Sequence, residues 1–157
     1  MATIKGSPAV AGKIKAVSIS QKRGTRKFNV LEAELKVGFG VEKDAHAGNW
    51  HRQVSFLAVE SIRKMTAKGL DIGAGDFAEN ITTEGINLQS LSIGTRLKVG
   101  PEAEVEITQF GKKCHTGCEI SRLVGDCIMP REGVFAKVTE PGQVKPGDRI
   151  EVSQQND

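Results

Sequence analysis

Short stretches of alternating hydrophobic and polar residues run through the chain and predict β-strands. Residues 10–19 alternate in this way, so Ile14 and Ala16 should face the interior while Lys13 and Lys15 face solvent. Shorter apolar runs predict further strands at 54–59, 96–99, 105–110, 134–138 and 149–152. These segments are brief and separated by turn residues, a pattern typical of proteins built mainly from β-sheet.

The clearest alternation lies at residues 31–39. Apolar side chains at every second position, from Leu31 through Leu35 to Phe39, alternate with Glu, Lys and Gly. This pattern favours one continuous strand with an apolar face, although Leu31 and Leu35 also suit one face of a helix.

Helices are predicted at only two places. Residues 60–68 place Ile62 and Met65 three positions apart, and Gly69 can end that helix. A second helix is predicted at 118–124. The chain has 18 glycines, many of them between the predicted strands, where they favour tight turns. The predicted fold is therefore mainly β with accessory helices (an α+β protein), forming a closed or nearly closed β-barrel.

The length of 157 residues predicts one domain, with a core spanning about residues 10–152. A membrane helix needs about 20 consecutive apolar residues, and the chain has no such run. The first residues lack the apolar core of a signal peptide, so a cytoplasmic location is expected.

Positive charge is concentrated at the start of the chain. Seven of the 22 Lys and Arg residues lie within residues 1–30, which contain none of the 19 acidic residues. This asymmetry suggests an anionic partner, or a basic edge strand that resists aggregation. The chain has six Phe, one Trp and no Tyr, too few rings for an extensive base-stacking platform, so nucleic acid is not expected as a partner.

The segment with the greatest chemical potential is 111–118, which begins Gly-Lys-Lys-Cys-His. Positive charge beside Cys114 favours the thiolate, which is both a soft-metal ligand and a sulfur nucleophile. The chain has three cysteines, an odd number that argues against a closed disulfide framework. Cys127 lies in an apolar context and is interpreted as a small buried residue. A zinc site formed by Cys114, Cys118, Cys127 and His115 is a less favoured alternative, because a second Cys pair is missing.

A second polar segment, 43–53, contains two of the three histidines of the chain. His46, His51 and Arg52 suit an oxyanion such as phosphate, and Asp44 with the two histidines could instead hold a metal. A rigid turn stabilised by Asp44 explains the same residues without any ligand.

Two further segments could contribute to a cofactor site. Within 75–85, Asn80 and Thr82 should point to the same side of a strand, although an ordinary turn–strand–turn is equally compatible. The basic loop at 22–27 could bind a phosphate through Lys22, Arg23 and Arg26. It does not match the P-loop pattern.

Taken together and in order, these segments resemble the MOSC domain, named for the C-terminal part of molybdenum cofactor sulfurases. The resemblance is carried by residues 43–48, 51–55, 75–82, 93–97, 111–115 and 129–135. It implies a β-barrel, a pterin-based molybdenum or tungsten cofactor as ligand, and a central role for Cys114 as metal ligand or persulfide sulfur carrier. The chain differs at Lys43 and Ala78, where many members have glycine.

The resemblance also implies that Asp44, His46, Arg52 and Asn80 line the cofactor pocket. All candidate cofactor-binding residues are Lys22, Arg23, Arg26, Asp44, His46, His51, Arg52, Asn80, Thr82 and His115, with Cys114 as catalytic residue and metal ligand. The sulfurases carry a pyridoxal-phosphate domain for which this chain has no room. Sulfur would therefore come from a partner such as a cysteine desulfurase, and cofactor biosynthesis proteins or molybdoenzymes are further candidate partners. Alternatives are the terminal component of a molybdenum-dependent reductase of N-hydroxylated substrates, and a non-catalytic zinc- or anion-binding module.

Overall fold

The computed structural model describes residues 11–22, 25–69, 71–111 and 128–154, and most regular structure in these segments is β-strand. The strands are β1 (Ala11–Ile19), β2 (Phe28–Val30), β3 (Ala33–Lys36), β4 (Gly40–Val41), β5 (Val54–Ala58), β6 (Ile81–Glu84), β7 (Arg96–Val99), β8 (Ala103–Phe110), β9 (Val134–Glu140), β10 (Gly142–Val144) and β11 (Arg149–Gln154). The helices are α1 (Val59–Thr66), the short 3₁₀ helix η2 (Leu88–Ser90) and α3 (Met129–Glu132).

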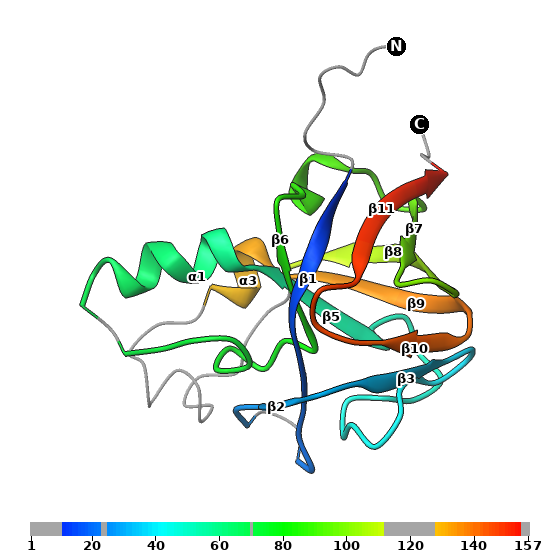
Figure 1. Cartoon of the computed structure of the whole chain (residues 1–157), viewed down its shortest axis with the longest axis horizontal. Coiled ribbons are helices and arrows are strands. Elements are labelled where there is room, and N and C mark those ends of the chain that lie inside the picture. Colours follow the sequence, from blue (N-terminus) through cyan, green and yellow to red (C-terminus); the bar gives the residue numbers. More distant parts are fainter. Residues whose placement is uncertain (1–10, 23–24, 70, 112–127, 155–157) are drawn as a thin grey trace.

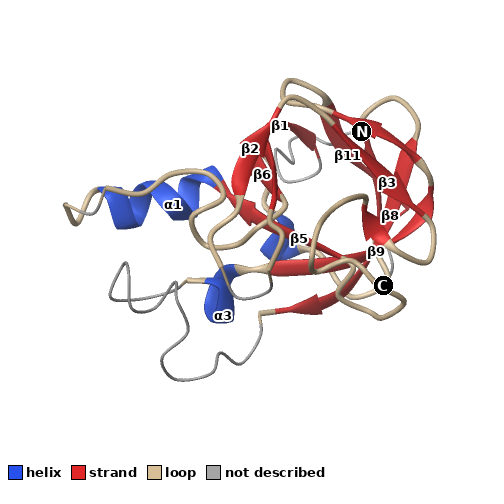
Figure 2. Cartoon of the chain, turned by 90° about the horizontal axis from the view of Figure 1, so that it is seen from below, coloured by secondary structure: helices blue, strands red, loops and turns tan. Residues whose placement is uncertain are grey.

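Within the described residues, seven strands close into a barrel. The hydrogen-bonded order is β11-β7-β8-β9-β5-β6-β1, and β11 also pairs with β1, which completes the ring. The β5–β6 pairing is parallel and the other pairings in the ring are antiparallel. Strand β2 extends the sheet beyond β1, while β10, β3 and β4 form a small separate sheet. Figures 1 and 2 show the ring of strands with α1 projecting to one side.

Apolar side chains from every strand of the ring fill the barrel. They include Val17, Phe56, Leu97 and Ile107, each fully buried. A second apolar cluster lies outside the barrel, where Leu57 and other side chains pack against α1 and α3. Strand β5 is thus covered on both faces, which explains why its sequence reads as a continuous apolar run rather than an alternation.

The predicted strand at 10–19 corresponds to β1 from Ala11 onward, and its alternation is confirmed at residues 13–16, where Ile14 and Ala16 are buried and Lys13 and Lys15 are exposed. The other predicted barrel strands correspond to β5, β7, β8, β9 and β11, with ends that differ by up to two residues. The predicted mainly β fold, a closed barrel with accessory helices, is confirmed.

The prediction of one continuous strand at 31–39 is wrong. Only Ala33–Lys36 is strand, and Leu31 and Val37 are 89% and 57% exposed. Gly38 has a φ of 74°, a left-handed conformation that turns the chain back into β4. The hydrophobic alternation continues through the turn that ends the strand, so periodicity alone does not reveal where the strand stops.

The first predicted helix is confirmed as α1, shifted by one or two residues at its ends, with Ile62 and Met65 buried. Gly69 follows it with a φ of 92° and donates its N–H to Thr66 O. The second predicted helix, at 118–124, lies outside the described residues. In the described part of the chain, no helix has the length and hydrophobicity to cross a membrane.

Candidate functional site

Cys114, His115, Cys118, Cys127 and Arg23 lie outside the described residues, but the structure fixes the point from which the cysteine segment departs. Gly111 ends β8 with a φ of 65°. Its N–H donates to Gly133 O at 2.7 Å, which joins the end of β8 to the start of β9. Gly111, the last described residue before the cysteine segment, is therefore held at the barrel wall.

Asp44 organises the polar loop at 42–53 from a buried position. Its Oδ1 accepts the N–H of Ser20 at 2.9 Å, and its Oδ2 accepts the N–H of His46 at 3.0 Å. The second bond closes a turn over its own chain, a common use of aspartate in loops. All described contacts of the Asp44 carboxylate are with protein groups, and its predicted place in the lining of a cofactor pocket stays a prediction.

The remaining partner of Asp44 is Lys27, whose Nζ lies 2.8 Å from Oδ1. Both side chains are almost completely buried, and Nζ also donates to Ser20 Oγ at 2.9 Å. This ion pair joins the basic loop to the 42–53 loop. Sequence reasoning missed Lys27, because a single lysine in a basic stretch carries no signal that distinguishes a buried side chain from a solvated one.

Arg52 is stacked against aromatic rings. Its guanidinium carbon lies 4.6 Å from the centre of the Trp50 ring and 5.7 Å from that of Phe135, within the range of cation–π attraction. His46 packs on the same rings, 4.9 Å from Trp50 and 6.4 Å from Phe135 between centroids. The Nε of Arg52 is buried and has no hydrogen-bond acceptor among the described residues. An arginine held in this way is prepared to donate to an anion.

His51 connects this loop to the strand that leads to the cysteine segment. Its Nε2 lies 2.7 Å from Gln109 Oε1, and Gln109 Nε2 donates to Gly111 O, also at 2.7 Å. Because the Gln109 amide donates through nitrogen, its oxygen is the acceptor, and Nε2 of His51 carries the proton. Thr108 adds a hydrogen bond from its hydroxyl to His51 O.

Asn80 and Thr82 are both completely buried. Asn80 Oδ1 accepts from the N–H and hydroxyl of Ser55, and its Nδ2 donates to Ser18 O at 3.2 Å, so it bridges β5 and β1. Thr82 donates its hydroxyl to Glu79 Oε2 at 2.8 Å. The described contacts of both side chains are internal to the barrel wall, and a cofactor contact for either stays a prediction.

Glu79 is an unusual member of this wall. It is fully buried, and its Oε2 accepts the N–H of Gly75 at 2.8 Å as well as the Thr82 hydroxyl. Its Oε1 has no hydrogen-bond partner among the described residues. Burial raises the pKa of this carboxyl, and the hydrogen bonds from Gly75 and Thr82 only partly oppose that effect.

The basic loop lies against the 75–85 segment. Lys27 N–H donates to Gly75 O at 2.8 Å, and Arg26 pairs with Asp76 at 3.2 Å on the surface. Lys22 is exposed. These hydrogen bonds and ion pairs bring the basic loop, the 42–53 loop, the 75–85 segment and the start of the cysteine segment into one region.

The metal alternative for Asp44, His46 and His51 finds no support in this geometry. Among the described residues, no three His, Cys, Asp or Glu side chains are grouped so that they could hold a metal ion. Asp44 is instead neutralised by Lys27. Any metal site would therefore depend on the cysteine segment.

The family model of the MOSC domain matches residues 43–151, more than half of the sequence. The chain belongs to the MOSC domain family. MOSC domains are associated with molybdenum cofactor binding or sulfur handling. No curated protein matches the sequence.

Solved structures with the same fold agree with this assignment at the level of the barrel. The YuaD protein of Bacillus subtilis superposes with a TM-score of 0.74 at 19% identity, covering 93% of this chain and 97% of that one. YiiM from Escherichia coli gives a TM-score of 0.65 at 18% identity, covering 92% of this chain and 71% of YiiM. YiiM from Geobacillus stearothermophilus gives 0.64 at 17% identity, with coverage of 91% and 73%. At these identities the likeness describes the MOSC fold alone.

Proposed function

We propose that this MOSC domain binds an anionic pterin molybdenum cofactor, and that Cys114 ligates its metal or carries sulfur for its maturation. The match of the MOSC family model to residues 43–151 carries this proposal. The match spans nearly all of the 42–53 loop, the 75–85 segment and the cysteine segment. It therefore includes all candidate residues except those of the basic loop.

The residues on this face of the barrel fit such a ligand. A pterin cofactor carries a phosphate, and the buried Nε of Arg52 has no acceptor among the described residues. Arginine recognises phosphate through its planar set of N–H donors, and stacking on Trp50 and Phe135 fixes the plane of that set. Arg52 would therefore hold the phosphate, and the exposed basic residues Lys22 and Arg26 would add favourable charge.

Cys114 supplies the reactive atom in both forms of the proposal. A bound cofactor would supply a molybdenum or tungsten centre, which accepts thiolate ligands. For sulfur transfer, the Cys114 thiolate attacks the terminal sulfur of a donor persulfide, and the donor cysteine leaves as a thiolate. The donor would be a protein persulfide such as that of a cysteine desulfurase. Lys112, Lys113 and His115 stand beside Cys114 in sequence and favour its ionised form.

His51 and Gln109 act as positioning residues in this proposal. Their hydrogen bond, continued from Gln109 to Gly111 O, joins the Arg52 loop to the strand that leads to Cys114. Arg52 and the start of the cysteine segment are thereby both held against strand β8.

The test is elemental analysis with pterin fluorescence on full-length protein purified without oxygen from a host that makes the cofactor. Wild type is compared with Cys114→Ser and Arg52→Gln, with Cys118→Ser and Arg63→Gln as matched controls. Arg63 is exposed and pairs with Glu84 on the surface. We expect near-stoichiometric molybdenum with pterin in the wild type and both controls. Arg52→Gln should lower occupancy by at least about tenfold, because a charge-assisted hydrogen bond to phosphate is lost.

The two forms of the proposal give different results for Cys114→Ser. Loss of metal in that variant supports a ligand role. Retained cofactor together with a persulfide found by mass spectrometry on wild-type Cys114 supports sulfur transfer. Zinc without pterin, or wild type with neither cofactor nor persulfide, overturns the proposal.

A further inference from the structure

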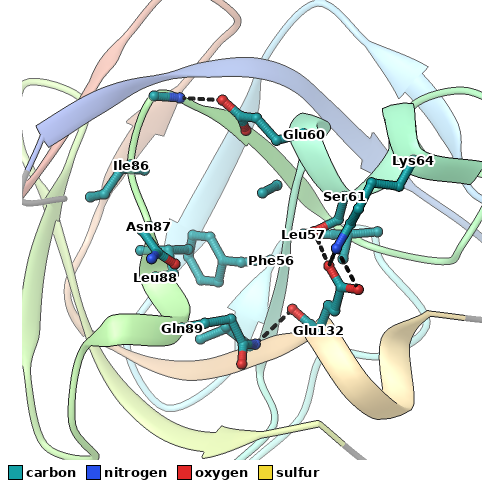
Figure 3. Close-up of a pocket in the computed structure, with 13 residues that line it drawn as sticks. Phe56, Leu57, Glu60, Ser61, Lys64, Ile86, Asn87, Leu88, Gln89 and Glu132 are labelled. Atoms are coloured by element: carbon teal, nitrogen blue, oxygen red, sulfur yellow. Dashed lines mark hydrogen bonds and ion pairs between the residues drawn. The ribbon is translucent and has the colours of Figure 1, made fainter. Parts of the chain in front are cut away.

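A cavity opens near the C-terminal end of β5. The 42–53 loop lies at the opposite end of this strand. The cavity has a volume of about 710 Å³ and lies between α1, η2 and the end of α3 (Figure 3). This size falls within the range of small-molecule sites, roughly 300–1,000 Å³. None of the residues that line the cavity belongs to the candidate cofactor site.

The floor of this cavity is apolar and belongs to the barrel. Phe56, Ile86, Leu88 and Val134 line it, and all four are buried members of the barrel core. Strand pairing fixes the floor, because Phe56 lies opposite Val134 in the β5–β9 ladder. A preformed apolar surface of this kind favours the flat or branched hydrocarbon part of a ligand.

One side of the rim is already neutralised. Glu132 accepts the hydroxyl of Ser61 and the ammonium of Lys64, the latter at 2.9 Å (Figure 3). Burial opposes ionisation of Glu132, but the bonds from Ser61 and Lys64 outweigh it and lower the pKa of the carboxyl. The Lys64–Glu132 pair therefore contributes a fixed positive and a fixed negative charge that compensate each other.

A second acid on the rim, Glu60 near the start of α1, has no ion-pair partner among the described residues. Glu60 Oε2 accepts the N–H of Gly85 at 2.9 Å, and no Lys or Arg pairs with Glu60 among the described residues. Figure 3 shows the Glu60 carboxylate turned away from the Ser61–Glu132–Lys64 group. Gln89 donates its Nε2 to Glu132 O at 2.8 Å, which leaves its Oε1 as an acceptor at the mouth. The mouth thus offers one net negative charge and a surplus of acceptors.

We propose that this cavity binds a small organic amine, with its apolar body on the floor beside Ile86 and Leu88 and its ammonium group at Glu60. An ammonium carries three donors and one positive charge, which complement a carboxylate and neighbouring amide acceptors. A carboxylate ligand of the same size would meet Glu60 as a like charge. The site is independent of the proposed cofactor function, because the two share no residue.

The proposal is tested by titrating the full-length chain with phenethylamine, phenethyl alcohol and phenylacetate, which share an aromatic body and differ in charge. Methyl NMR of Ile, Leu and Val residues follows binding, and Ile86, Leu88 and Val134 report directly from the floor. We expect saturable shifts at these methyl groups for the amine, with affinity at least about tenfold above that for phenylacetate.

Two variants test charge and shape separately. Glu60→Gln keeps an acceptor for Gly85 N–H but removes the charge, so amine affinity should fall about tenfold while alcohol affinity stays the same. Ala58→Phe should fill the cavity and abolish binding of both. Glu32→Gln, an exposed carboxyl outside the cavity, is the matched control and should bind like the wild type.

Equal affinity for amine and alcohol, shifts outside the cavity, or no saturable shift would each overturn the proposal. Cys114→Ser should bind phenethylamine as the wild type does, whatever its molybdenum content. This variant therefore separates failure of the amine site from failure of the cofactor function.

Discussion

At the scale of single residues, Lys43 and Ala78 occupy backbone that ordinarily suits glycine. Their φ angles are 71° and 68°, which lie in the left-handed region. A side chain at a left-handed φ costs the folded state about 1–2 kcal/mol, and replacing it with glycine removes this strain. Because glycine also gives the unfolded chain more conformational freedom, roughly 0.4–1 kcal/mol of the gain is offset. Lys43→Gly and Ala78→Gly should each raise the free energy of unfolding by about 0.5–1 kcal/mol in urea denaturation.

Lys98→Gly is the control for this pair, because Lys98 is an exposed residue in the extended strand β7. Glycine in a strand lowers stability by roughly 0.5–1 kcal/mol, so this variant should change in the opposite direction. A loss of stability in Lys43→Gly and Ala78→Gly would show that their side chains do more for the fold than the backbone strain costs.

Glu79 gives the fold a predictable pH dependence. Burial holds the folded-state pKa of its carboxyl above the ordinary value of 4.5, so the folded chain binds this proton more tightly than the unfolded chain. The resulting stabilisation is complete below the unfolded pKa and is lost as pH rises through the folded pKa. Glu79→Gln cannot ionise, so its stability relative to wild type should increase between about pH 4 and about pH 7. Urea denaturation across this range measures the difference, and Glu102→Gln, an exposed control, should show none.

At the scale of elements, the buried Lys27–Asp44 pair joins the loop after β1 to the loop before β5. Asp44→Ala removes one partner and leaves a buried lysine without its counter-charge, which typically costs about 3–5 kcal/mol. It also frees the N–H groups of Ser20 and His46. We expect urea denaturation of Asp44→Ala to show a decrease of this size in the free energy of unfolding.

The double variant Lys27→Met with Asp44→Leu separates charge from packing. Replacing both members of a buried pair by apolar residues is often neutral or better, so the double variant should recover much of the loss. Glu42→Ala disrupts the exposed Lys36–Glu42 pair and should cost at most about 1 kcal/mol. An equal cost in the buried and exposed variants would contradict the role given to Asp44.

The position of most elements could be read from the sequence, since alternation and glycine turns are local signals. The closed order of the strands could not, because pairings such as β1 with β11 join segments at opposite ends of the chain. In the candidate site, Arg52 and His51 were found as polar residues in a loop. Lys27 and Gln109 were not, because their partners lie 17 and 58 positions away and nothing local marks them as buried or bonded.

At the scale of the whole molecule, β5 separates the two proposed binding regions. Arg52 precedes the strand, while Ala58 and Glu60 lie at its far end. Strand β5 is buried on both faces, so it forms a rigid spacer rather than a flexible connection. Substitutions at one region should therefore leave ligand binding at the other unchanged, which is measured by phenethylamine titration of Cys114→Ser and by molybdenum analysis of Glu60→Gln.

Closure of the barrel depends on Gly12, where β1 passes from β6 to β11. Lys13 lies opposite residues of both strands, and Gly12 pairs with Ile150. A Cβ on Gly12 would collide with Glu84 O and would approach Ile86 N to 2.8 Å, and both are backbone atoms that cannot move aside as a side chain could.

Gly12→Ala should therefore push β1 away from its neighbours and lower the free energy of unfolding by about 1–3 kcal/mol, as overpacking does elsewhere. The amides of β1 and β11 should exchange with solvent faster than those of β8 and β9, because the strain falls at the closing strands. Gly73→Ala is the matched control, since a Cβ there meets no atom within 4 Å and its φ is not positive. That control should be neutral or gain about 0.4–1 kcal/mol. If Gly12→Ala is as stable as Gly73→Ala, the barrel tolerates a wider opening at this seam than its geometry indicates.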